Sequence, residues 1–83
     1  MNLDHDKIDD AVLALLYLTS SQDKMQKQFG VASAWKSHDW DTLSRLHEKG
    51  FISDPVNKDK SVMLSEEGFK RSRELFEKLF SKP

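Results

Sequence analysis

The chain has 83 residues, a formal net charge of −1 and no cysteine. This length is enough for one domain and not for two, so residues 1–83 are expected to fold as a single domain. The lack of cysteine excludes disulfide bonds, thiol catalysis and thiolate metal sites, and the near-zero charge gives no overall attraction for nucleic acid or anionic lipid. Nothing resembles a signal peptide, and the apolar run Ala11 to Leu18 is too short to span a bilayer, so we expect a cytoplasmic protein without a membrane partner.

The first predicted helix runs from about Asp6 to Thr19. Asp4 or Asp6 suits the N-cap position, and acidic residues in a first turn suit the helix dipole. From Ala11 onward the segment is apolar on almost every side, so this helix either lies at the centre of the domain or has a partner that covers it. Both interpretations stay open, and Tyr17 is the candidate interface residue on this helix.

Residues 20–37 have the least regular pattern in the chain. A short helix is predicted from Gln22 to Phe29, with Met25 and Phe29 directed toward the core and Gly30 at its end. In a winged helix this segment would be the first helix of the helix-turn-helix. Residues 31–35 are expected to form a link.

The central part of the chain predicts a helix, a hairpin and a last helix. Apolar residues recur at helical spacing over residues 39–49, and Gly50 ends that helix because only glycine enters the left-handed conformation without steric cost. Residues 51–53 and 61–64 are short apolar runs on either side of turn-forming residues, which predicts a β-hairpin. Ser65 then caps a helix over residues 65–81, with Gly68 where a capping box would have Glu or Gln.

This order of elements is that of the second half of a winged helix. We therefore predict an α+β fold, a small winged-helix-like domain of three to four helices with a two-stranded β-hairpin wing. Six apolar residues are predicted to share its core: Leu43, Leu46, Ile52, Leu64, Phe69 and Phe76.

Two resemblances accompany this prediction. Leu43-x-x-Leu46-x-x-x-Gly50-x-Ile52, a charged turn and Val62-x-Leu64-Ser65-Glu66-Glu67-Gly68 resemble the recognition helix, wing and following helix of MarR- and PadR-like winged-helix regulators. A closer resemblance covers most of the chain outside residues 20–33. The sequence segments that carry it are Lys7 to Leu16, Ala34-Trp35-Lys36-x-x-Asp39-Trp40-x-x-Leu43-x-x-Leu46-His47-Glu48-Lys49-Gly50 and Ile52-Ser53-Asp54-Pro55. They look like a family of small bacterial proteins known only as a domain of unknown function, which implies no activity, substrate or cofactor.

A DNA-binding regulator is the alternative function. The helix over residues 38–49 would be the recognition helix and residues 54–61 the wing, with Arg45, Lys58 and Lys60 as candidate nucleic-acid contacts. Such a surface needs cations for phosphates and donors for base edges. The helix carries three acidic residues against two basic ones, and aspartates offset the lysines of the wing. Charge therefore disfavours DNA binding although the architecture favours it.

Protein interaction or homodimerisation is the favoured function, with a second copy or another protein as the expected partner. The apolar first helix and the tail residues Phe76, Leu79 and Phe80 carry more apolar surface than one small core needs. Such a surplus usually marks a contact. The plainer interpretation, that both segments simply fill the core, stays open.

Catalysis and metal binding are not expected. His5, His38 and His47 are the only histidines, and no pair of them has ligand spacing on one helical turn. No nucleophile, base and orienting group can be named together, so we expect no enzyme activity, no cofactor and no metal. Trp35 and Trp40 flank a Lys-Ser-His-Asp segment and either line a small pocket or anchor the core.

Overall fold

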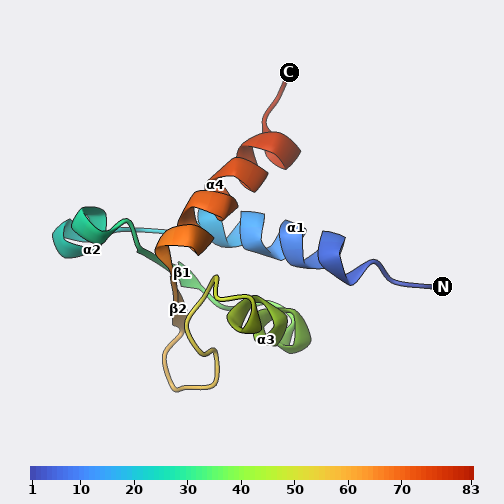
Figure 1. Cartoon of the computed structure of the whole chain (residues 1–83), viewed down its shortest axis with the longest axis horizontal. Helices are drawn as coiled ribbons and strands as arrows, with labels where there is room; N and C mark the ends of the chain where they lie inside the picture. The colour runs from blue at the N-terminus through green and yellow to red at the C-terminus, as the bar shows by residue number, and fades with distance from the viewer.

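A computed structural model describes the whole chain, residues 1–83 (Figure 1). Its elements in chain order are α1 His5–Leu18, α2 Lys24–Phe29, β1 Ala32–Trp35, α3 Trp40–Glu48, β2 Ser61–Leu64 and α4 Glu66–Phe80. The predicted fold class is confirmed: four helices accompany a two-stranded antiparallel sheet, in a layout consistent with that of a winged helix.

Local capping rules determine where the helices begin and end. The side chains of Asp4, Asp39 and Ser65 each accept a hydrogen bond from the backbone N–H three residues further on. These N–H groups have no partner within the helix, so the caps stabilise the first turns of α1, α3 and α4. Gly30 and Gly50 follow α2 and α3 with φ of 71° and 81°, the left-handed conformation in which glycine ends a helix.

The core forms where α1, α3, α4 and the sheet meet. Helix α1 packs against both α4 and α3, which places it centrally, as one of the two interpretations of its sequence predicted. Of the six predicted core residues, four are buried and Phe69 and Phe76 are partly buried against them. The buried apolar cluster consists of Leu13, Ala14, Leu16, Ala32, Ala34, Leu43, Leu46, Ile52, Val62, Leu64 and Leu75.

The sheet differs from the predicted hairpin in one strand. β2 lies where the sequence predicts it, but β1 is its paired neighbour, with Ala32 opposite Leu64. Residues 31–35, expected to be a link, therefore form a strand, and residues 51–53 contribute only an isolated bridge between Ile52 and Leu64. Alanine at both buried positions of β1 has weak strand propensity, so the sequence gives little sign of this strand.

Both outer sides of the sheet are partly covered. Ser21 and Ser33 exchange two backbone hydrogen bonds of 2.8 and 2.9 Å across the free side of β1. On the free side of β2, the backbone N–H of Ser53 donates to the carbonyl of Met63 at 2.8 Å. These single bridges occupy backbone groups that an open strand edge would present to another chain.

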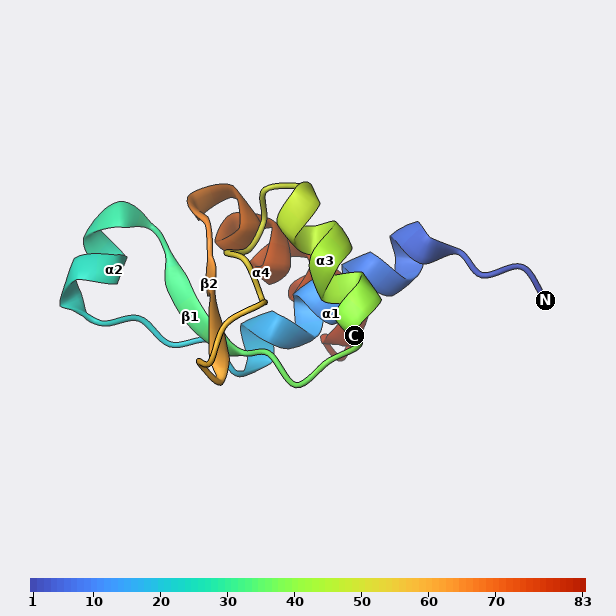
Figure 2. The ribbon, with the colours of Figure 1, turned by 90° about the horizontal axis from the view of Figure 1, so that it is seen from below.

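Helix α2 does not form a helix-turn-helix with α3, contrary to the prediction. That motif needs two consecutive helices joined by a short turn, whereas β1 intervenes here and α2 lies apart from α3, with the sheet between them (Figures 1 and 2). Met25 and Phe29 are 69% and 61% exposed and do not face the core. A capping box between Asp23 and Gln26 holds this six-residue helix together instead of apolar packing.

The glycine in the first turn of α4 has a packing reason. A Cβ at Gly68 would collide with the backbone carbonyl of Phe51. The Glu or Gln of a capping box therefore does not fit there, and Ser65 caps the helix alone by accepting from the Gly68 N–H at 3.0 Å.

Candidate binding surfaces

The four predicted interface residues lie along the contact between α1 and α4, in two different environments. The ring of Tyr17 has its centroid 5.4 Å from that of Phe76 and 5.8 Å from that of Phe69. Tyr17 and Phe76 therefore hold the two helices together within the chain. Leu79 and Phe80 are 47% and 48% exposed at the end of α4, where the Phe80 ring continues the aromatic row 5.6 Å from Phe76.

Leu79 and Phe80 border a groove of about 420 Å³ between the first half of α1 and the second half of α4. The two helices cross and then diverge toward the chain ends, which opens this space (Figure 1). Ala11 and Leu75 add apolar surface to it, and we call it the α1–α4 groove. Charged residues of both signs complete its lining: Lys7, Asp10 and Lys78.

Arg45, a predicted nucleic-acid contact, is occupied within the fold. Its Nε donates to Asp9 Oδ1 and Oδ2 at 2.9 and 3.1 Å, and its second terminal nitrogen lies 2.8 Å from Oδ1. Lys49 Nζ lies 2.8 Å from Oδ2 of the same carboxylate. The side chain of Asp9 is fully buried, so these ion pairs join α1 to α3 inside the molecule.

The two cations also control the ionisation of that carboxylate. Burial alone raises the pKa of Asp9, but the hydrogen bonds from Arg45 and Lys49 outweigh it and leave the pKa below its ordinary value of 3.8. The bond to Asp9 likewise raises the pKa of Lys49 above 10.5. No local sequence pattern links Asp9 to Arg45, which lies 36 positions further along the chain.

Lys58 and Lys60 lie on the exposed connection between α3 and β2, and neither forms an ion pair. Arg45, by contrast, is turned toward Asp9 on α1. The structure therefore does not gather the three predicted nucleic-acid contacts into one site.

Trp35 and Trp40 border one shallow groove of about 610 Å³, which we call the tryptophan groove. They are 53% and 56% exposed, so neither anchors the core. Between them in sequence, Lys36 Nζ donates to the carbonyl oxygens of Pro55 and Asn57 at 2.8 and 3.1 Å and to Asn57 Oδ1 at 2.9 Å. The remaining lining comes from Ser37, His38, Asp59 and Lys60.

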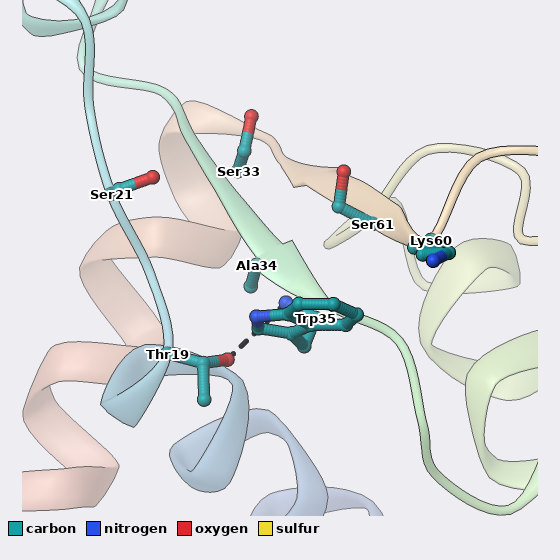
Figure 3. Close-up of a pocket in the computed structure, with 7 residues that line it drawn as sticks. All are labelled: Thr19, Ser21, Ser33, Ala34, Trp35, Lys60 and Ser61. Carbon is teal, nitrogen blue, oxygen red and sulfur yellow. Dashed lines mark hydrogen bonds between the residues drawn. The ribbon is translucent and has the colours of Figure 1, made fainter.

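A second hollow, of about 260 Å³, is shown with its lining residues in Figure 3. Trp35 and Lys60 line both spaces, so the two lie side by side at these residues. The Trp35 backbone N–H donates to Thr19 Oγ1 at 3.2 Å, which ties this end of β1 to the end of α1. Hydroxyl groups dominate the lining of the hollow, which includes Thr19, Ser21, Ser33 and Ser61.

The histidines do not converge with other ligands. No group of three or more His, Cys, Asp or Glu side chains is placed so that it could hold a metal ion. Nδ1 of His47 lies 3.0 Å from the carbonyl oxygen of Ile52, at the end of α3. Burial lowers the pKa of His38 below its ordinary value of 6.5. None of the helices combines the length and apolar character needed to cross a membrane.

Comparison with known proteins assigns the family. A family model described as a domain of unknown function, DUF6429, matches residues 4–82. The chain belongs to this family. It is also similar to the uncharacterized protein y4hR of Sinorhizobium fredii (strain NBRC 101917 / NGR234), with 54% identity over 82 residues that cover 99% of this chain and 100% of the relative. No solved structure matches the chain. The predicted membership of a small bacterial family of unknown function is therefore confirmed.

Proposed function

We propose that this DUF6429 protein is a cytoplasmic protein-interaction module that forms a homodimer through the α1–α4 groove. One observation carries the proposal: Leu79 and Phe80 stay about half exposed beside a groove that already contains Ala11 and the buried Leu75. Apolar side chains that border an apolar groove mark an interaction site more strongly than scattered ones. The partner's Leu79 and Phe80 would fill this groove while those of the first copy fill the partner's.

The charges around the groove favour a second copy of this chain as the partner. A two-fold interface brings the same surface together twice, so it must be complementary to itself. Lys7 and Lys78 lie at the groove together with Asp10. A surface that bears both signs can place a lysine of one copy near Asp10 of the other, whereas a single-sign surface would repel its own copy.

The internal ion pair of Arg45 weighs against the DNA-binding alternative. A duplex-DNA site needs several free cations on one face, and Arg45 is already paired with the buried carboxylate of Asp9. We accordingly propose a non-enzymatic role in assembly, without a cofactor or metal.

Sedimentation velocity across a concentration series tests the dimer. We expect the wild-type protein to sediment as a dimer and the double variant Leu79→Glu, Phe80→Glu to sediment as a monomer, because unpaired charges placed in an apolar contact are costly. Met25→Glu, Phe29→Glu is the matched control. It makes the same chemical change at two apolar residues that are 69% and 61% exposed on α2, and it should leave the dimer intact.

Circular dichroism of both double variants shows whether the fold survives the substitutions. A wild-type protein that stays monomeric at every concentration, or a dimer that only the α2 variant disrupts, would contradict the proposal. Titration with random duplex DNA at two salt concentrations tests the alternative. Affinity that falls steeply with salt, and that is lost with Lys58→Ala and Lys60→Ala, would favour DNA binding.

A further inference from the structure

The tryptophan groove and the adjoining hollow lie side by side and share Trp35 and Lys60, and we call the two together the track. A small-molecule site usually encloses most of its ligand, and two indoles that are each more than half exposed cannot do so. A shallow track whose lining includes an exposed ring instead suits an extended chain that runs across that ring.

Hydrogen bonds within the chain hold the two sides of the tryptophan groove together. Lys36 Nζ uses its three N–H donors on Pro55 and Asn57, which fixes the segment before α3 to the connection before β2. The same ammonium lies 6.0 Å from the centroid of the Trp40 ring, within range of a cation–π contact. A preformed groove lowers the entropy cost of binding, and the cost is lowest when the ligand is stiff as well.

The charges on the track determine which extended polymer fits. A single nucleic-acid strand stacks its bases on aromatic rings but also needs cations along its phosphates. Lys36 has no donor left for a phosphate, and Lys60, the remaining cation of the lining, is accompanied by Asp59. The track therefore suits a polymer with little charge.

From these observations we infer that the tryptophan groove binds a proline-rich peptide segment in the polyproline II conformation. Such a segment is already extended and stiff, and its carbonyl groups have no internal hydrogen bonds. Grooves lined by aromatic side chains recognise it by packing proline rings on the aromatic faces. The indole N–H groups of Trp35 and Trp40 make no hydrogen bond within the chain and can donate to its carbonyls, as can the hydroxyls of the adjoining hollow.

Tryptophan fluorescence and the two indole N–H signals in NMR spectra test this inference directly, because Trp35 and Trp40 are the chain's two tryptophans. Addition of a proline decapeptide should shift the emission and both indole signals in a saturable way. A glycine–serine peptide of the same length and a thymidine oligonucleotide should produce no saturable shift. Trp35→Ala should weaken the binding by about tenfold or more, the loss typical of an aromatic anchor. Phe29→Ala, which removes another aromatic ring that is more than half exposed, on α2, should leave the binding unchanged.

Four results would overturn the inference. They are no shift of either indole signal at millimolar proline peptide, an equal response to the glycine–serine peptide, tight binding of the oligonucleotide in its place, and unchanged affinity in Trp35→Ala. The wild-type indole signals give the answer without any variant, so the test stands even when Trp35→Ala fails to fold. The tryptophan groove and the α1–α4 groove share no residue, so the result is independent of dimer formation.

Discussion

Replacing Asp9 with asparagine should destabilise the protein more than any other change of a single charge. The carboxylate is fully buried and lies within 2.9 Å of both Arg45 and Lys49. Removing one partner of a buried ion pair typically costs about 3–5 kcal/mol. The side chains of Arg45 and Lys49 are 28% and 38% exposed, so water restores part of their solvation, and we expect Asp9→Asn to lower the free energy of unfolding by about 2–4 kcal/mol.

Urea unfolding followed by circular dichroism measures this loss, and Asp6→Asn is the matched control. Asp6 lies 3.5 Å from the same Lys49, but its side chain is 91% exposed, and an exposed ion pair contributes about 0–1 kcal/mol. A loss for Asp9→Asn below about 1 kcal/mol, or one equal to that of Asp6→Asn, would refute the reasoning that burial makes this carboxylate important for stability.

Four further outcomes are expected. Because folding lowers the pKa of Asp9, the stabilisation that its carboxylate provides is complete above pH 3.8 and is lost as the pH falls through its pKa in the folded protein. The urea midpoint of the wild type should therefore decrease in acid, and Asp9→Asn should lack this decrease. Burial also lowers the pKa of His38, so the melting temperature should decline as the pH falls below 6.5. His38→Gln should abolish that decline, and an equal decline in the variant would assign it to another titratable group. Leu46→Ala, at a side chain that is 1% exposed, should cost about 2–5 kcal/mol in urea unfolding, whereas Leu18→Ala, at 63% exposed, should cost less than about 1 kcal/mol. Gly68→Ala should lower the melting temperature because the added methyl group would collide with the backbone carbonyl of Phe51. The same change in an unobstructed helix stabilises the protein by about 1 kcal/mol, so a higher melting temperature would contradict the collision.

The sequence predicts well those parts of the fold that depend on residues close in the chain. Ser65 caps α4 and Gly50 ends α3, each through a bond or backbone angle within a few residues. Strand β1 depends on distant partners instead: its pairing with β2 joins Ala32 to Leu64. A strand of small residues has little preference of its own, so the identity of its neighbours determines it.

The candidate surfaces, too, are predictable from the sequence only where they depend on residues close in the chain. The apolar tail of α4 is visible in the sequence, and Leu79 and Phe80 do lie at the surface. The sequence does not show that Tyr17 and Phe76 pack on each other, that Arg45 is paired with a buried carboxylate, or that both tryptophans are exposed. Each of these depends on the crossing of α1 with α3 or α4, or on the position of the loop before β2.

The contact between the first and last helices also has a consequence during synthesis. Helix α1 ends at residue 18, and α4, the helix that covers much of its apolar surface, ends at residue 80. At about 5–20 residues per second, a ribosome takes about 3–12 seconds to synthesise the intervening residues. Throughout that interval the nascent chain carries an apolar helix without its main partner, so the core cannot be completed before α4 has been synthesised.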